Sequence, residues 1–119
     1  MPNTVEYYLS KGFDSKAAHY FASGRRKPVS VIPKDSNRLL ITFDNLEHRL
    51  FDMTPLIKEN TVYYILNNKS VFNRCYIDSE GSICWDKDPT VDSEKVWSNK
   101  IDLGADTCYL ESVEYKNIV

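Results

Sequence analysis

The amino-acid sequence predicts an α+β fold, in which a small antiparallel sheet of hairpins packs with short helices behind a two-helix N-terminal extension. Three observations predict it. Two capped helical segments precede residue 26, the hydrophobic pattern then changes to strand-like alternation, and two turn-separated strand pairs occupy residues 38–53 and 75–85. We therefore divide the chain into a helical extension, residues 1–26, and an α+β core domain, residues 27–119, which together form one compact unit.

Two short helices are expected at the N-terminus. Asn3 is the predicted N-cap of the first, with Glu6 in the capping-box position, and Gly12 ends it. Asp14 caps the second helix and Gly24 ends it.

The next segments read as strands. Residues 28–33 form a short strand bounded by prolines, which suits the edge of a sheet. Leu39, Ile41 and Phe43 then alternate with residues of the second face, so this strand is expected to bury one side.

The turn after Phe43 sets the register of the predicted hairpin. If Asn45 and Leu46 form a two-residue turn, Phe43 faces His48 and Ile41 faces Leu50. The expected inward face is then Leu39, Ile41, Phe43, His48 and Leu50. Leu46 fits such a turn poorly, because the turn favours Gly with a positive φ, and a longer loop is the alternative.

The remaining segments are shorter. Thr54 as N-cap, followed by Pro55, predicts a helix start, and Asp106 is the expected cap of a last short helix. Residues 62–66 suit a strand or a buried helix equally well. The other expectations are a short helix at 68–72, a hairpin at 75–85 and a polar loop at 86–99.

Composition restricts the class of protein. The 119 residues suit one globular domain, with 42% apolar and 27% charged residues. No apolar run is long enough to span a bilayer, and the N-terminus lacks a secretory signal, so we expect a cytoplasmic protein. Three cysteines without a Cys-x-x-Cys pair argue against a disulfide framework or a zinc site and indicate small buried thiols.

The net charge of −2 favours no class of partner, but the charges are unevenly distributed. Residues 1–34 carry six basic and two acidic side chains, whereas residues 78–94 hold six carboxylates and only Lys87. The chain therefore has a mildly basic front and an acidic back.

Two segments carry a family resemblance. Residues 29–57 contain Leu-x-Ile-Thr-Phe-Asp-Asn and Leu-Phe-Asp-Met-x-Pro-Leu, and residues 97–109 are similar to a closing Trp-x-Asn-Gly-x-Asp-Leu-x-x-Asp-x-Leu-Tyr motif. On these motifs the chain, over about residues 28–110, resembles the bacterial family called Domain of Unknown Function 2442. Leu46 and Lys100 stand where that family usually has Gly, and extra acidic sequence precedes residue 97.

The resemblance implies a small α+β domain with an antiparallel sheet and short helices. It also implies a gene and domain context. Members of that family occur alone, beside small genes in toxin–antitoxin-like arrangements, or joined to helix-turn-helix domains. The family has no established catalytic residues, so none is transferred to this chain. The helical extension lies outside the family core and resembles an accessory interaction element.

No catalytic residue, cofactor site or metal site is predicted. The sequence has no Gly-x-Ser-x-Gly motif, no phosphate-binding loop and no cysteine with a plausible nearby histidine. His48 is expected to be an inward structural histidine, and His19 is expected to be exposed. The acidic segment lacks the central Gly and the distal Glu of an EF-hand, so a metal is its least favoured interpretation.

Two groups of residues are candidates for binding a partner. The basic front offers aromatic and cationic side chains: Tyr7, Tyr8, Lys16, Arg25 and Arg26. The acidic loop offers carboxylates between two tryptophans: Trp85, Asp86, Asp88, Asp92 and Trp97. Each group also has a structural interpretation, as a charge cluster at a helix end, a solvated loop or core tryptophans.

These observations favour a small non-enzymatic protein-interaction or regulatory module that docks on a partner protein. One alternative is an antitoxin-like regulator that contacts nucleic acid through the basic front, although a pI of about 5.6 is unusual for such a protein. Another is a mobile-element inhibitor whose acidic surface mimics nucleic acid. A metal-dependent enzyme is the weakest alternative, and the oligomeric state is not predicted.

Overall fold

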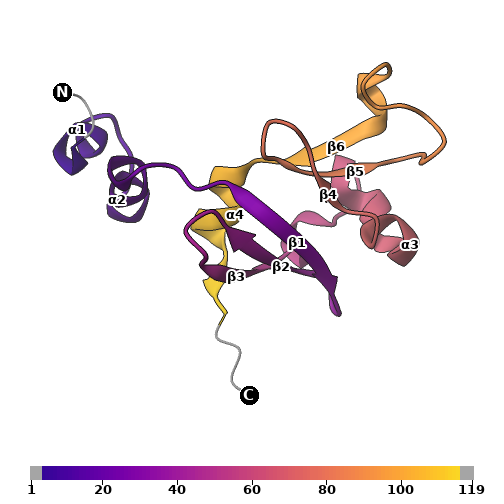
Figure 1. The fold of residues 1–119 in the computed structure, drawn as a ribbon, viewed down its shortest axis with the longest axis horizontal. Helices are drawn as coiled ribbons and strands as arrows, with labels where there is room; N and C mark the ends of the chain where they lie inside the picture. The colour runs from indigo at the N-terminus through magenta and orange to yellow at the C-terminus, as the bar shows by residue number, and fades with distance from the viewer. Residues whose placement is uncertain (1–3, 116–119) are drawn as a thin grey trace.

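The computed structural model describes residues 4–115 and contains two small antiparallel sheets with short helices beside them (Figure 1), so the α+β prediction is confirmed. The helical elements are α1 (Val5–Ser10), α2 (Ser15–Ser23), η1 (Thr54–Leu56), η2 (Val62–Asn67), α3 (Lys69–Phe72), η3 (Trp97–Asn99) and α4 (Ala105–Glu111). The strands are β1 (Pro28–Lys34), β2 (Arg38–Phe43), β3 (His48–Asp52), β4 (Tyr76–Ile77), β5 (Ile83–Asp86), β6 (Lys100–Leu103) and β7 (Val113–Glu114).

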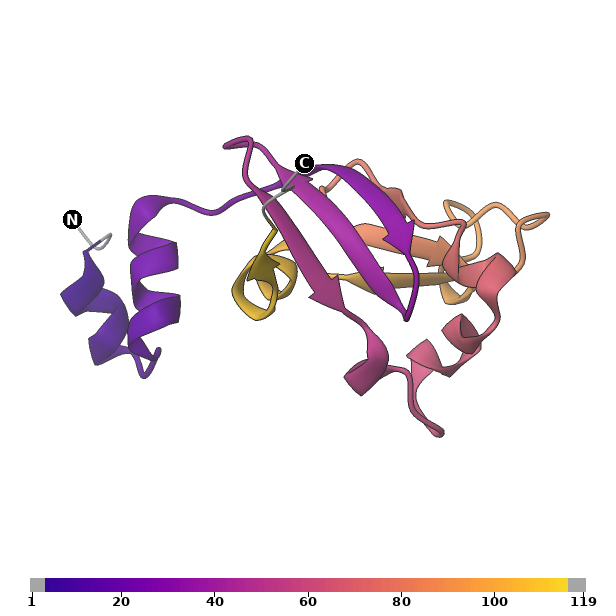
Figure 2. The same cartoon turned by 90° about the horizontal axis from the view of Figure 1, so that it is seen from below.

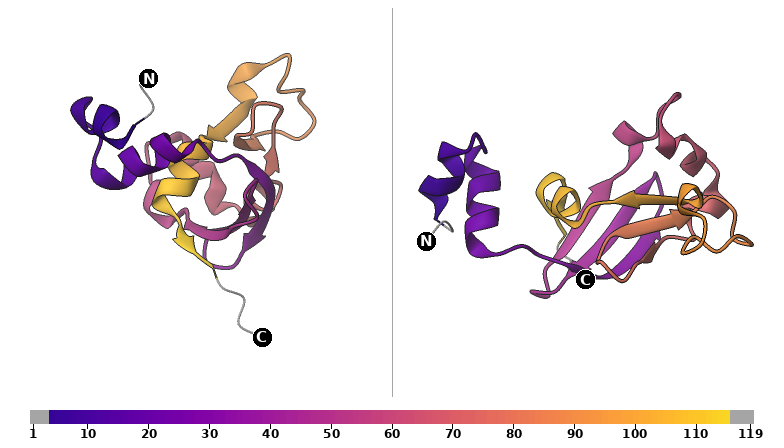
Figure 3. Two further views of the ribbon diagram at one scale, coloured as in Figure 1. Left: turned by 60° about the vertical axis from the view of Figure 1, so that its left-hand side comes forward. Right: turned by 90° about the horizontal axis from the view of Figure 1, so that it is seen from above.

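The two sheets share one hydrophobic core. The strand order is β1-β2-β3-β7 in the first sheet and β4-β5-β6 in the second, and Figure 2 shows the sheets one behind the other. Both contribute buried side chains to the same cluster, which α3 and α4 complete: Leu39, Ile41, Phe43, Phe51, Phe72, Ile83, Trp85, Ile101, Leu103 and Cys108. The pair α1–α2 lies to one side of both sheets and joins β1 through residues 24–27 (Figure 3).

The predicted caps of α2 are confirmed. The Asp14 carboxylate accepts a hydrogen bond from the Ala17 N–H at 2.8 Å, and Gly24 ends the helix with φ +100°. Asn3, the predicted cap of α1, lies outside the described residues. Within them Thr4 is the N-cap, since its hydroxyl accepts from the Tyr7 N–H at 3.1 Å.

The predicted register of the first hairpin is wrong by one residue. Thr42, not Phe43, is opposite His48, and Leu40, not Ile41, is opposite Leu50. The loop has three residues, because the Phe43 N–H donates to the Glu47 carbonyl at 2.9 Å. Leu46 is its last residue and has φ +70°, the left-handed conformation that such a loop requires.

This shift changes which residues of β3 face the core. Side chains alternate between the faces of a strand, so a shift of one residue exchanges the two faces. Phe51 is buried beside Leu39, whereas His48 is exposed and Leu50 is half-buried. The prediction of an inward His48 is therefore wrong, and its Nδ1 lies 2.9 Å from the Thr42 hydroxyl on the outer face.

Several smaller predictions are corrected too. Thr54 is the first residue of η1, with Met53 at the cap position, and Asp106 lies in the first turn of α4, with Gly104 at the cap position. Residues 62–66, which suited strand or helix, belong to the 3-10 helix η2. The hairpin of β4 and β5 and the helix α3 are confirmed, whereas the short strands β6 and β7 were not predicted.

Candidate functional site

The first candidate surface is the arm, which we define as residues 4–27 with helices α1 and α2. Tyr20 attaches it to the core by stacking on Tyr109, with ring centroids 5.0 Å apart. The Tyr20 hydroxyl donates to the Asp106 carboxylate at 2.6 Å and accepts from the Arg26 N–H at 2.9 Å. Burial and the hydrogen bond to Asp106 raise the pKa of Tyr20, which stays a neutral donor.

Two cations of the arm add to this attachment. The Lys16 ammonium group donates to the Leu110 carbonyl at the end of α4. The Arg25 guanidinium lies 3.5 Å from the Asp106 carboxylate, but its side chain is 70% exposed, so this ion pair contributes little stability. Of the predicted site residues, Lys16 therefore helps to hold α2 on α4 and Arg26 binds Tyr20 through its backbone N–H, whereas Arg25 contributes little.

The outer part of the arm is aromatic and only partly covered. Tyr8, Phe13 and Phe21 contact one another with centroid distances of 5.0–5.9 Å, beside an open hollow of about 470 Å³. No residue of α1 is buried, and three large apolar side chains of the arm are exposed: Tyr7, Leu9 and Phe13. The predicted residues Tyr7 and Tyr8 thus lie on a helix that has no buried residue, with Tyr7 exposed and Tyr8 half-buried.

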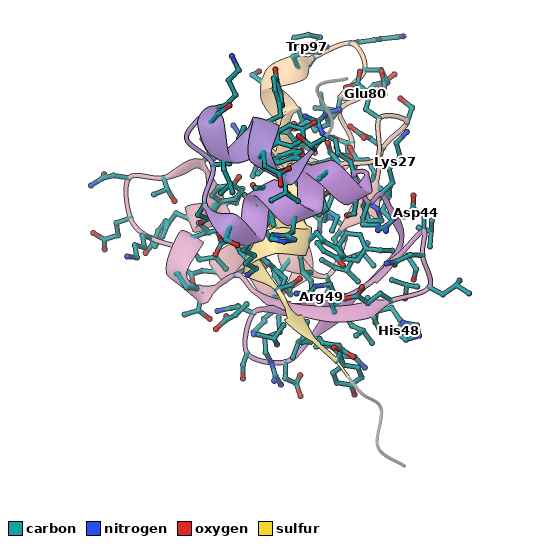
Figure 4. The ribbon with its side chains drawn as sticks, turned by 90° about the vertical axis from the view of Figure 1, so that its left-hand side faces the viewer. Lys27, Asp44, His48, Arg49, Glu80 and Trp97 are labelled. Atoms are coloured by element: carbon teal, nitrogen blue, oxygen red, sulfur yellow. The ribbon has the colours of Figure 1, made fainter. Side chains whose placement is uncertain are left out.

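Below the arm, a polar network fixes β3 to α4. The Arg49 guanidinium lies 4.5 Å from the Tyr109 ring centroid, donates to the Ser112 hydroxyl and carbonyl at 2.7 Å, and pairs with Glu47. Burial opposes ionisation of Glu47, but hydrogen bonds from Tyr109 and Arg49 outweigh it and lower its pKa. Figure 4 shows Arg49 beneath the arm and His48 at the outer edge of the molecule.

The second candidate surface is the Trp97 loop, which we define as residues 86–99. Its centre is Asn99, a buried residue that sequence reasoning missed. The Asn99 amide nitrogen lies within 3.0–3.1 Å of the Asp88 carbonyl, the Val91 carbonyl and the Ser93 hydroxyl, and its oxygen accepts from the Asp88 N–H at 2.9 Å. The available signal was its place two residues after Trp97, where the resembled motif also has Asn.

The predicted carboxylates of this loop form internal hydrogen bonds. Asp86 accepts from the Tyr76 hydroxyl at 2.8 Å and from the Ser93 hydroxyl at 2.6 Å. Burial, together with the hydrogen bond to Asp86, raises the pKa of Tyr76.

Asp88 and Asp92 stabilise turns. The Asp88 carboxylate accepts from the N–H and the hydroxyl of Thr90, which lowers its pKa, and the Asp92 carboxylate accepts from the Glu94 N–H at 2.9 Å. Sequence reasoning treated these side chains as free surface charges. Their main observed role is to shape the loop.

The two tryptophans have opposite environments. Trp85 is completely buried, and its indole N–H donates to the Phe72 carbonyl at 3.0 Å, so we remove it from the candidates for partner binding. Trp97, at the start of η3, is 85% exposed. An indole left in water at the tip of an ordered loop is unusual, because tryptophan is normally highly buried.

A hollow of about 290 Å³ adjoins Trp97. Its lining is Asp78, Ser79, Glu80, Glu94, Trp97, Lys100 and Asp102, and Figure 4 shows Trp97 and Glu80 near one another at one rim of the molecule. Partial burial of Asp78 opposes its ionisation, but hydrogen bonds from Lys100, at 2.9 Å, and from the Ser82 N–H lower its pKa to about 2. Lys100 and Asp102 were not predicted as site residues.

The described residues offer no reactive thiol. All three cysteines are free, and burial raises the pKa of Cys75 to about 11 and the pKa values of Cys84 and Cys108 to about 12. His19 is exposed, as predicted, with Nδ1 2.7 Å from the Ser15 carbonyl oxygen. Across residues 4–115, no group of three His, Cys, Asp or Glu side chains is arranged to hold a metal ion.

Comparison with known proteins adds no relative. No family model matches the chain, and neither a curated protein nor a solved structure shows significant similarity to it. The resemblance of residues 28–110 to Domain of Unknown Function 2442 therefore stays a prediction. None of the helices in the described part of the chain has the length and apolar character needed to cross a membrane.

Proposed function

We propose that this protein is a small non-enzymatic interaction or regulatory module that docks on a partner protein through the arm. One observation carries the proposal: the arm contacts the core through α2 and residues 24–27, while Tyr7, Leu9 and Phe13 on its outer part are exposed. Apolar side chains gathered in this way mark contact surfaces on soluble proteins.

The stability of the arm supports the same conclusion. Helices of six and nine residues are marginal without tertiary packing. A partner that covers the aromatic side chains would supply the missing packing. The arm carries five cations against Glu6 and Asp14, so an acidic surface on the partner would complement it.

Capture from a native lysate tests this proposal. The arm variant carries Tyr7→Ser, Leu9→Ser and Phe13→Ser, and the matched control replaces three exposed apolar residues of the core, Val29→Ser, Ile32→Ser and Val62→Ser. The wild type and the control should return one stoichiometric protein that the arm variant does not. Repeated recovery of the protein alone, or equal loss in both variants, would contradict the proposal.

A nucleic-acid-contacting, antitoxin-like regulator is the second candidate, favoured by the exposed Arg25 beside Arg26. Binding of a nucleic acid should weaken steeply with salt and disappear in the double variant Arg25→Glu, Arg26→Glu. The alternative of a mobile-element inhibitor, whose acidic surface mimics nucleic acid, has less support. Asp86, Asp88 and Asp92 accept hydrogen bonds within their own loop. Free cysteines support the expected cytoplasmic location.

A further inference from the structure

Trp97 is the exposed feature that the arm does not account for. The loop that carries it, residues 86–99, lies at the end of the molecule opposite the arm (Figure 1), and the neighbouring Val96 is also exposed. Asn99 and the turns of Asp88 and Asp92 hold this loop in shape. The indole is therefore presented on an ordered platform, which lowers the entropy cost of binding to it.

The charges beside Trp97 indicate what the surface binds. The hollow is lined by four carboxylates and one ammonium group. Asp78 and Lys100 neutralise one another at 2.9 Å, whereas Glu80, Glu94 and Asp102 form no ion pair within residues 4–115. Three uncompensated carboxylates around an aromatic face favour a cationic group.

The shape and chemistry favour a guanidinium over other cations. A guanidinium group stacks flat on an indole and donates two parallel hydrogen bonds to a carboxylate, which an ammonium group does not. A hollow of about 290 Å³ is small for a drug-sized ligand and suits the end of one side chain.

We propose that Trp97 and the adjoining hollow bind an arginine side chain from a basic segment of a partner protein, with the guanidinium on the indole face and paired with Glu80 or Glu94. This inference rests on the proposed function only in taking the partner to be a protein. The surface is separate from the arm, so each can be tested without disturbing the other.

The experiment titrates the full chain with an acetylated, amidated Gly-Arg-Gly-Arg-Gly peptide and follows the Trp97 indole N–H by NMR, with Trp97→Phe to assign the signal. A counterpart with citrulline keeps the shape and removes the charge. We expect a saturable shift with the arginine peptide only. Binding, measured in every variant by isothermal titration calorimetry, should weaken at least five-fold in Trp97→Ala and in the double variant Glu80→Gln, Glu94→Gln.

A matched double variant, Asp35→Asn with Glu59→Gln, removes two exposed carboxylates elsewhere and should bind like the wild type. Equal binding of the citrulline peptide, or equal weakening by the matched variant, would overturn the proposal in favour of general charge attraction. Self-association of the chain that Trp97→Ala abolishes would overturn it in favour of a second copy as the occupant. The arm variant should bind the peptide normally, which separates this result from failure of the proposed function.

Discussion

At the scale of single residues, Asn99 does more for the candidate surface than any charged side chain of its loop. Its side-chain amide contacts three segments of the Trp97 loop at once. Water does not readily replace these contacts, because Asn99 and Ser93 are both buried. The position of Trp97 therefore depends on a residue two places further along the chain.

Asn99→Ala should destabilise the protein by about 2 kcal/mol, since it leaves buried donors and acceptors without partners. Denaturant unfolding followed by circular dichroism measures the change in the free energy of unfolding. Asn67→Ala, at an exposed position, is the control and should have little effect. If Asn99→Ala lowers the free energy of unfolding no more than the control does, the loop does not depend on the Asn99 amide.

Ionisation of the Asp78 carboxylate should make the free energy of unfolding depend on pH. Its folded pKa of about 2 lies below the ordinary value of 3.8, because its hydrogen bonds favour the charged form despite burial. A lowered folded pKa gives stability that is fully present above pH 4 and is lost as the pH falls through about 2.

Asp78→Asn should therefore flatten the fall in unfolding free energy between about pH 4 and pH 2. Urea unfolding at a series of pH values measures the slope. Lys100→Met should reduce it as well, since Lys100 supplies the strongest hydrogen bond to this carboxylate. A wild-type slope in Asp78→Asn would assign the acid sensitivity to other groups.

At the scale of the elements, the attachment of the arm depends on Tyr20. Its hydroxyl both accepts from the chain after α2 and donates to α4, so the same group orders the linker and fixes the arm to the core. The other contacts between the arm and the core include the stacking of Tyr20 on Tyr109, the Lys16 hydrogen bond to α4 and the exposed Arg25 ion pair. The arm is thus expected to open separately from the core.

Tyr20→Phe should accelerate tryptic cleavage at Arg25 and Arg26 roughly ten-fold, because losing these hydrogen bonds costs about 1.5 kcal/mol. Stacking on Tyr109 should be retained. Tyr7→Phe, on the exposed face of α1, is the matched control. Cleavage of Tyr20→Phe at the wild-type rate would mean that ring stacking on Tyr109 and the Lys16 hydrogen bond to Leu110 suffice to hold the arm on the core.

The first hairpin carries a strained residue that can be relieved. Leu46 has φ +70° and is 78% exposed, so it contributes strain without packing. Leu46→Gly should stabilise the protein by about 1 kcal/mol and raise the melting temperature. Leu46→Ala removes the same exposed side chain but keeps the strain, and a gain as large in this control would refute the explanation.

The sequence predicted elements best where local signals were strong. Capping by Asp14, the glycine after α2 and the turn between β4 and β5 were all found, because each depends on neighbouring residues. The register of β2 and β3 was missed, since it depends on whether Leu46 adopts a positive φ. The short strands β6 and β7 escaped detection because their pairing partners are distant in sequence.

At the scale of the whole molecule, the two candidate surfaces lie at opposite ends (Figure 2). The distribution of charges along the sequence predicted a basic front and an acidic back, but the sequence did not distinguish the environment of Trp85 from that of Trp97. Only the packing of both sheets reveals that one is core and the other surface. Likewise, no local pattern showed which carboxylates are engaged in turns and which line the hollow beside Trp97.

The contrast between the two tryptophans has a practical consequence. The fluorescence of Trp85 reports on the hydrophobic core, and that of Trp97 reports on the Trp97 loop. Their emission wavelengths differ because the Trp85 indole is buried and the Trp97 indole is in water. A single natural fluorescence spectrum thus contains two independent signals, without any added label. Quenching by caesium, a cation that the carboxylates beside Trp97 attract, should remove the red component first, so loosening of the loop can be followed while the core remains intact.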